Sequence, residues 1–171
     1  LKIADNEIKW LTGKEDYDEG VQMIKERSNV KLVNVTLGNE GSLTYYMDQK
    51  HYGRPFLSDK TIDTTGAGDT FCACVIGFLL EHGLDGLKEA DLKRMLSFAN
   101  AAASIVTTRK GAICSMPDRE EVNTLLANYG KEPREQNTAS SFDILLGSVD
   151  KVKAFVNDMR KIEGDALLCV G

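Results

Sequence analysis

The stretch DTTGAGDTF, residues 63–71, carries the strongest indication of the fold and of the chemistry. Gly66 and Gly68 stand at the start of an apolar run that we expect to be helical as far as about Glu81. A glycine turn at the mouth of a helix leaves backbone N–H groups free to face an anion, and the helix dipole attracts negative charge there. Asp69 lies just inside this mouth, placed to take a proton from a hydroxyl that attacks a phosphoryl group. The alternative is a purely structural tight turn, with Asp69 as a favourable first-turn charge.

Two better-known phosphate-binding motifs do not fit this turn. A dinucleotide-binding GxGxxG motif would need a third glycine where Phe71 stands. A P-loop would need a Gly-Lys-Ser or Gly-Lys-Thr sequence, and the chain contains neither. The turn therefore indicates a different class of anion-binding site.

Helices and strands are predicted in alternation around this turn. Gly13 would close the first helix, and Pro55 would confine the third strand to a sheet edge. Pro117 and Asp118 would begin the last helix, and a turn over residues 38–41 would join the first two strands as a hairpin. The expected helices cover residues 5–12, 16–28, 67 to about 81, 89–108 and about 118–129, and the expected strands residues 31–38, 42–47 and 51–57. This order predicts an α/β domain built around a layered sheet.

The cysteines and the paired tyrosines are interpreted as structural residues. A metal site would require CxxC or Cys/His spacing, and the chain does not have it. We therefore expect reduced, buried thiols at Cys72, Cys74, Cys114 and Cys169. In the pair at residues 45–46, alternation along a strand places one of the two tyrosines in the core.

The overall composition is that of a soluble globular protein. The 171 residues are 42% hydrophobic and 27% charged, with a formal net charge of −5. Because nucleic acids and anionic membranes attract basic surfaces, this charge argues against either as a partner. No apolar run approaches the roughly 20 residues that span a bilayer, and no signal peptide is visible. We therefore expect a cytoplasmic location.

The end of the chain is predicted to be separate from the domain before it. Residues 131–141 are polar, with glycine, proline and serine around them, and are interpreted as a linker. Residues 142–171 have the pattern of a small βαβ unit, which is too small to bury both its sheet and its helix. The chain also starts at Leu1 and ends directly after an apolar run, so that both ends look cut.

Four segments resemble the carbohydrate kinases of the PfkB, or ribokinase-like, family. DTTGAGDTF matches the second signature of that family throughout its length. Three further family segments are matched, in the family's order, by KIADNEIKWLTG (2–13), VTLGNEGSLTYY (35–46) and ANAAASIVTTRKGA (99–112). The resemblance covers residues 1–130 and implies the C-terminal half of a ribokinase-like, layered α/β/α domain. Residues 142–171 resemble the first half of an HPr-like phosphocarrier domain.

The resemblance implies a role for each residue of the glycine turn. Asp69 would be the catalytic base acting on a sugar hydroxyl. The backbone of Gly66, Ala67 and Gly68 would form the anion hole for the transferred phosphoryl group. The residues that shape the nucleotide loop and lie beside the adenine would be Thr36, Gly38, Gly41, Asn100 and Ala103.

The resemblance also implies ATP, Mg²⁺ and K⁺ as ligands. Glu7 matches the acidic residue that organises Mg²⁺ and its water molecules near the phosphates. Ala4 departs from the pattern, because ribokinases carry asparagine there and many fructokinases serine, so one polar contact is missing. Potassium would lie beside the anion hole in an oxygen cage, the ligand type that suits a hard cation. The cage would consist of the Asp63 carboxylate, the carbonyls of Thr65, Val106, Arg109 and Gly111, and Ser115. The alternatives are a plain turn residue for Asp63 and a basic helix end for Arg109.

Together these roles predict ATP-dependent phosphorylation of a sugar hydroxyl. Overall likeness favours a fructokinase, with fructose as the substrate, while ribokinase and other hexose or ketose kinases stay open. In this family the sugar is gripped largely by N-terminal residues that this sequence does not contain, so we expect the chain alone to be inactive. A homodimer is compatible with the resemblance. The alternative function is a non-catalytic nucleotide-binding module, or an incomplete kinase, joined to an HPr-like piece.

Overall fold

The computed structural model describes residues 1–129, and within them four strands form one mixed sheet. The strands, in their order across the sheet, are β1 (Lys2–Ala4), β2 (Leu32–Thr36), β3 (Ser42–Tyr46) and β4 (Gln49–Gly53). β1 runs parallel to β2, whereas β2, β3 and β4 are antiparallel neighbours. The predicted linker (131–141) and the predicted βαβ unit (142–171) lie outside the described residues.

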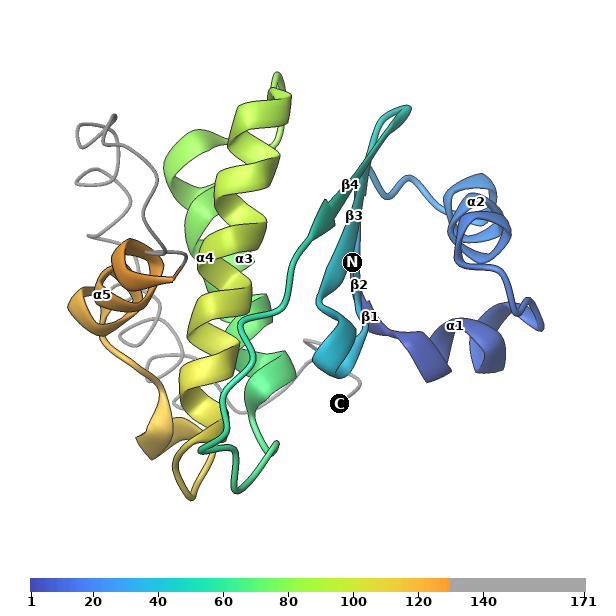
Figure 1. Cartoon of the computed structure of the whole chain (residues 1–171). Coiled ribbons are helices and arrows are strands. Elements are labelled where there is room, and N and C mark those ends of the chain that lie inside the picture. Colours follow the sequence, from blue (N-terminus) through green and yellow to red (C-terminus); the bar gives the residue numbers. More distant parts are fainter. Residues whose placement is uncertain (130–171) are drawn as a thin grey trace, which may run out of the picture.

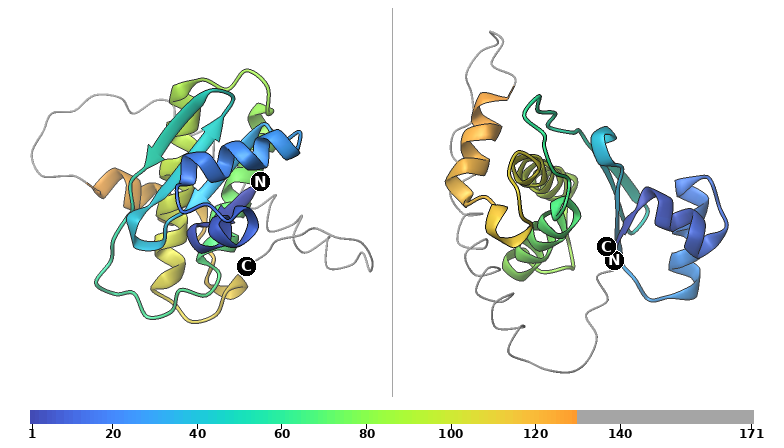
Figure 2. Two further views of the ribbon diagram at one scale, coloured as in Figure 1. Left: turned by 90° about the vertical axis from the view of Figure 1, so that its right-hand side faces the viewer. Right: turned by 90° about the horizontal axis from the view of Figure 1, so that it is seen from below.

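Helices cover both faces of this sheet and give the domain its layers (Figure 1). α1 (Asp5–Thr12) and α2 (Tyr17–Arg27) lie on one face. α3 (Ala67–His82) and α4 (Glu89–Thr107) lie on the other face, and α5 (Arg119–Asn128) packs against α4. The view from below shows the same succession of helices, sheet and helices (Figure 2). The predicted α/β architecture is confirmed.

Local signals begin and end the helices where the sequence predicts. Gly13 has φ 71° and ψ 6°, the left-handed conformation, and ends α1 by donating its amide to the Lys9 carbonyl at 2.8 Å. The Asp118 carboxylate accepts the Glu121 amide at 2.9 Å and begins α5. These ends fix the length of each helix and therefore which of its side chains face the sheet.

Both faces of the central strands are buried. Val33 of β2 belongs to an apolar cluster with α1 and α2, and Leu32 belongs to a second cluster with α3 and α4. Tyr45 and Tyr46 alternate in the same way, and both are buried, with 7% and 3% of their surface exposed. The prediction that one of the two tyrosines lies in the core is therefore wrong, because helices cover the second face as well.

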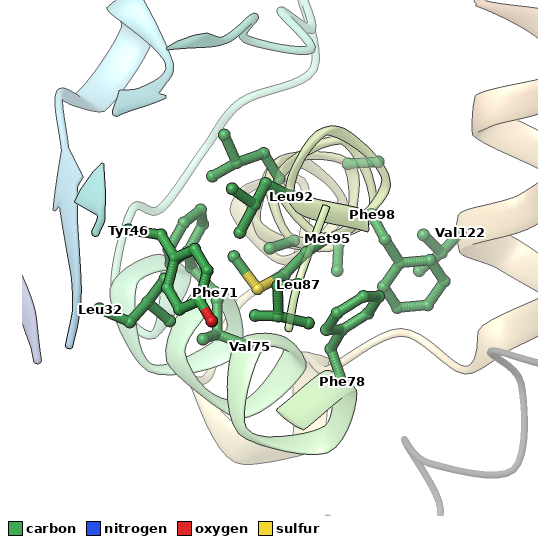
Figure 3. Close-up of a cluster of buried hydrophobic side chains, with 14 of the residues drawn as sticks. Leu32, Tyr46, Phe71, Val75, Phe78, Leu87, Leu92, Met95, Phe98 and Val122 are labelled. Atoms are coloured by element: carbon green, nitrogen blue, oxygen red, sulfur yellow. The ribbon is translucent and has the colours of Figure 1, made fainter. Parts of the chain in front are cut away.

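The larger apolar core holds α3 and α4 against the sheet (Figure 3). Phe71 and Phe78 of α3 and Leu92 and Met95 of α4 are each at most 1% exposed, and Tyr46 joins them from β3. Burying a side chain of this size contributes about 1.5–3 kcal/mol relative to leaving it exposed. This packing fixes the axis of α3 and hence the position of its first turn at the edge of the sheet.

Two strands differ from the prediction. β1 was not predicted, because only its pairing with β2 makes these three residues a strand. β4 ends at Gly53 rather than continuing to residue 57. A Cβ at Gly53 would lie 2.7 Å from Asn100 Nδ2 and 2.9 Å from Leu96 Cβ, so the chain passes directly over α4 there. Two residues later Pro55 has no N–H with which to extend the ladder.

The expectation of buried thiols holds only in part. Cys72 and Cys74 are half-buried on α3 and form no disulfide, and burial raises the pKa of the Cys74 thiol to about 12. Cys114 is exposed. It lies in the short 3-10 helix η2 (Ile113–Ser115), in which only Ser115 faces the interior. Cys169 lies outside the described residues. Within residues 1–129 no helix is long and apolar enough to cross a membrane.

Candidate active site

The glycine turn opens α3 as the sequence predicts. Gly66 precedes the helix with φ 85° and ψ −2°, a left-handed conformation that favours glycine. The Ala67 amide donates to the Thr64 carbonyl at 3.2 Å, whereas no acceptor in the described part of the chain takes the amides of Gly66, Gly68 and Asp69. Free amides at the positive end of a helix attract an anion. The turn can therefore bind a phosphate or a phosphoryl group.

Gly66 also fits closely against the loop that follows α4. A Cβ at Gly66 would lie 2.8 Å from both Cα and Cβ of Ala112. The loop is held in place on either side of Ala112, because the Arg109 guanidinium pairs with a carboxylate of α5 and Ser115 Oγ donates to the Lys110 carbonyl at 2.7 Å. Two segments that are far apart in the sequence thus build the mouth of α3 together.

Asp69 lies in the first turn of α3 with an exposed side chain. Among residues 1–129 its carboxylate accepts no hydrogen bond and forms no ion pair. It lines a cavity of about 460 Å³ between α3 and the strands β1 and β2. A free carboxylate in the same turn as free amides can accept the proton of a hydroxyl that attacks an anion bound to those amides.

A second cavity, of about 210 Å³, starts at Ala67 of the same turn and extends between the β2–β3 connection and α4. Four of the five predicted nucleotide-site residues line it, namely Gly38, Gly41, Asn100 and Ala103. The fifth, Thr36, ends β2 and is not among the lining residues. The remaining walls include Pro55, Phe56, Leu57, Ser104 and Thr107.

Asn100 ties the walls of this second cavity together. It is 8% exposed, and its Nδ2 donates to Ser42 Oγ at 2.9 Å and to the Arg54 carbonyl at 3.1 Å. Gly41 has φ 96°, and a Cβ there would lie 2.2 Å from the Gly53 carbonyl oxygen. The β2–β3 turn and the end of β4 are therefore closed onto α4 by contacts that tolerate no larger residues.

The predicted potassium ligands Asp63, Thr65 and Gly111 come together beside the glycine turn. The amides of Ile62 and Asp63 donate to the Thr107 carbonyl at 2.8 and 3.1 Å, which ties Asp63 to the end of α4. Asp63 Oδ1 accepts the Thr65 amide at 2.9 Å. This hydrogen bond is the main cause that lowers the pKa of Asp63, and the Thr65 hydroxyl and the Gly111 amide lower it further. An ionised carboxylate is a ligand of the type that suits a hard cation.

Two other predicted potassium ligands already have partners. The Val106 carbonyl accepts the Arg109 amide at 3.1 Å, which leaves one lone pair for a cation. The Ser115 hydroxyl is buried and donates to the Lys110 carbonyl, so an oxygen lone pair, and not its hydrogen, is available. Both residues therefore keep an oxygen lone pair that a cation could contact.

Glu7 serves as the cap of α1. Its Oε2 accepts the Ala4 amide at 2.6 Å, whereas the methyl side chain of Ala4 has no polar atom with which to cap the helix. No group of three or more histidine, cysteine, aspartate or glutamate side chains within residues 1–129 is arranged to hold a metal ion. A magnesium ion would therefore have to be held largely by nucleotide phosphates and water, with Glu7 contributing its remaining oxygen.

Lys2 lies at the site although nothing in the sequence singled it out. Its Nζ is 2.9 Å from the point that a Cβ of Gly68 would occupy. Lys2 also lines the same cavity as Asp69. Without a predicted strand at residues 2–4, no pattern placed this side chain on the α3 side of the sheet.

Known proteins resemble the chain over the same segment. A family model described as pfkB family carbohydrate kinase matches residues 1–119. The protein named probable fructokinase-4 from Arabidopsis thaliana is 37% identical over 126 residues, which cover 74% of this chain and 38% of that relative. A fructokinase from Solanum tuberosum is 38% identical over 126 residues, which cover 74% of this chain and 39% of that relative.

Solved structures share the fold. A fructokinase double mutant from Vibrio cholerae O395, solved with fructose, ADP and a potassium ion, has a TM-score of 0.62 and 30% identity. The match covers 73% of this chain and 39% of that one. A ribokinase from Thermotoga maritima has a TM-score of 0.62 and 32% identity, covering 75% of this chain and 42% of that one. The chain thus spans 38% to 42% of the length of these four relatives.

Proposed function

The chain belongs to the pfkB family of carbohydrate kinases, and on this premise we propose that it forms the nucleotide-binding and catalytic part of a kinase that transfers the γ-phosphoryl group of ATP to a hydroxyl of fructose. The observation that carries the proposal is the first turn of α3. Its free amides and the free carboxylate of Asp69 lie where both cavities begin. The smaller cavity would take the nucleotide, and the acceptor hydroxyl would approach from the side of Asp69.

In the proposed step Asp69 and the α3 amides act on the two reacting partners. The Asp69 carboxylate accepts the proton of the acceptor hydroxyl as its oxygen forms a bond to the γ-phosphorus. The bond between that phosphorus and the oxygen bridging to the β-phosphate breaks, and ADP leaves. The amides of Gly68 and Asp69 donate hydrogen bonds to the phosphoryl oxygens, where negative charge is concentrated.

We also propose ligands for the two cations that the family resemblance implies. Bound Mg²⁺ and K⁺ would neutralise negative charge on the nucleotide phosphates. Asp63, Thr65 and Gly111 already converge beside Gly66, so they are the ligands we propose for K⁺. The second oxygen of Glu7 is the group we propose for Mg²⁺ or its water molecules.

Fructose is the proposed acceptor because of the relatives' names and not because of a sugar pocket. The two curated relatives are named fructokinases, and the V. cholerae structure contains fructose. Ribose is the alternative, since the T. maritima ribokinase has the same TM-score. A cytoplasmic location and a homodimer stay predictions.

A second candidate function is a nucleotide-binding module without turnover. The cavity beside Asp69 is lined largely by apolar side chains, among them Val75, Ile76, Leu79 and Leu84. Sugars are held by hydrogen bonds to their hydroxyls, and such a lining supplies few of them. The chain could therefore bind ADP or ATP and still hold no sugar.

Calorimetric titration of the 171-residue chain with Mg-ADP, first in K⁺ and then in Na⁺ buffer, tests the proposal. Saturable binding that weakens in Na⁺ is expected. A chain that unfolds cooperatively but binds no ADP would refute both candidate functions. An assay of ADP release with fructose or ribose then separates them, since turnover supports the kinase and binding without turnover supports the module.

A further inference from the structure

Lys2 carries a positive charge to the mouth of α3. It begins β1, and its register partner on β2 is Asn34, so the two residues are neighbours on adjacent strands. Both line the cavity beneath α3. From there the Lys2 ammonium reaches Gly68, where a Cβ would lie 2.9 Å from Nζ.

No group in the described part of the chain holds this ammonium. Lys2 Nζ forms no hydrogen bond and no ion pair there, although Asp69 lines the same cavity. Asn34 is 1% exposed, and its Oδ1 has no hydrogen-bond partner among these residues either. Buried polar groups are normally paired. The unpaired Lys2 ammonium can therefore bind an anionic ligand at this end of the cavity, whereas the Asn34 oxygen is a hydrogen-bond acceptor and would not contact an anion.

The charge of that ligand follows from the electrostatics. The start of α3 carries about half a positive charge, and three of its amides are free. An ammonium next to this helix end is repelled, whereas an anion bound between them would be attracted by both. The contrast is Lys31, which lines the far end of the same cavity and is paired with Asp85 at 2.7 Å.

We propose that Lys2 is a further phosphate-binding residue of the active site, whose ammonium contacts the γ-phosphoryl group of ATP together with the free amides of α3. The inference rests on the proposed function. A lysine binds phosphate as a point charge. While the phosphorus exchanges its bond to the bridging oxygen for one to the acceptor oxygen, Lys2 neutralises charge and takes no part in the proton transfer, which belongs to Asp69. Because ADP lacks the γ-phosphoryl group, Lys2 distinguishes the triphosphate from the diphosphate.

Calorimetric titration of the full chain with Mg-ADP and with Mg-AMP-PNP, a non-hydrolysable ATP analogue, tests this role. Lys2→Met is expected to weaken AMP-PNP binding about 10- to 100-fold, which is the range for the loss of one hydrogen bond to a charged group. The same variant is expected to weaken ADP binding less than about 3-fold. Lys2→Arg keeps the charge and is expected to restore most of the AMP-PNP affinity. Lys31→Met removes the same charge from the far end of the cavity and is the matched control, for which both affinities stay unchanged.

The outcomes separate this inference from the proposed function. Equal weakening of both nucleotides, or weakening of neither, would overturn the role of Lys2 and leave ADP binding, and with it the proposed function, in place. If Lys2→Met does not fold, Lys2→Gln replaces it, and retained ADP binding shows that the variant is folded. A wild-type chain that unfolds cooperatively and binds neither nucleotide would refute the proposed function and the role of Lys2 together.

Discussion

Replacing Gly66 by alanine is expected to destabilise the fold and to disrupt the anion site at the same time. The φ of 85° costs a non-glycine residue about 1–2 kcal/mol. The new Cβ would also lie 2.8 Å from Cα and Cβ of Ala112, and an overpacked contact of this kind costs about 1–3 kcal/mol more. The free energy of unfolding is therefore expected to fall by about 2–5 kcal/mol. Since the contact involves backbone, no rotamer change relieves it, and ADP affinity is expected to fall as well.

Gly13→Ala is the matched control for this prediction. Gly13 has φ 71° and ψ 6°, close to the values of Gly66, but a Cβ there would have nothing within 4 Å. Only the conformational cost of about 1–2 kcal/mol applies to it. Urea unfolding followed by circular dichroism gives both free energies, and calorimetry gives ADP affinity. If the two variants lost the same stability, or if Gly66→Ala bound ADP like the wild type, the close fit of Gly66 against Ala112 would not be a requirement of the site.

Three further changes test the base, one ion pair and the thiols. In an assay of sugar phosphorylation, Asp69→Asn is expected to lower kcat about 10²- to 10⁴-fold with ADP affinity nearly unchanged; wild-type turnover would exclude Asp69 as the base. The hydrogen bond from Lys50 lowers the pKa of Asp18, so its contribution to stability is present at neutral pH and is lost as the pH falls below about 4. Asp18→Asn is therefore expected to flatten the dependence of the urea midpoint on pH in that acid range, and an unchanged slope would contradict this assignment. Cys114 is exposed while burial raises the pKa of Cys74 to about 12, so Cys114→Ser is expected to slow thiol labelling and Cys74→Ser is not.

The features that could be predicted from the sequence are those set by neighbouring residues. Gly13 ends α1 and Asp118 begins α5 through contacts within a few positions of each, so the residue types alone indicate them. The glycine turn at residues 66–68 is local in the same sense, because the start of an apolar helix and the residues before it lie together in the chain. Four of the five predicted nucleotide-site residues, Gly38, Gly41, Asn100 and Ala103, line one cavity, and their role in binding a nucleotide stays a prediction.

The features that could not be predicted depend on pairing between distant segments. β1 is a strand only because it lies beside β2, thirty-two positions later by register. That pairing puts Lys2 on the α3 side of the sheet, and no pattern in its own segment reports this. Tyr45 and Tyr46 are both buried because α1 and α2 return to cover the second face. Glu7 likewise has a role that the sequence did not predict. Its carboxylate accepts the Ala4 amide and so caps α1, because the Ala4 side chain has no polar atom that could do so.

The two sides of the proposed transfer are not equally complete within the described residues. On the proposed nucleotide side, contacts between β3, β4 and α4 join the walls of the cavity. Asn100 forms hydrogen bonds across it, and the backbone at Gly41 and Gly53 packs too closely to admit a side chain. Such a cavity is preorganised, and binding there needs little rearrangement. On the acceptor side, Asp69 and Lys2 face a cavity of about 460 Å³ whose other walls are mostly apolar. A site that holds the phosphates and the base but few sugar contacts should bind nucleotide in advance of any sugar. If ADP alone produced heat and fructose added at saturating ADP produced none, the chain would hold a nucleotide site without a sugar site, and saturable heat from fructose would refute this reasoning.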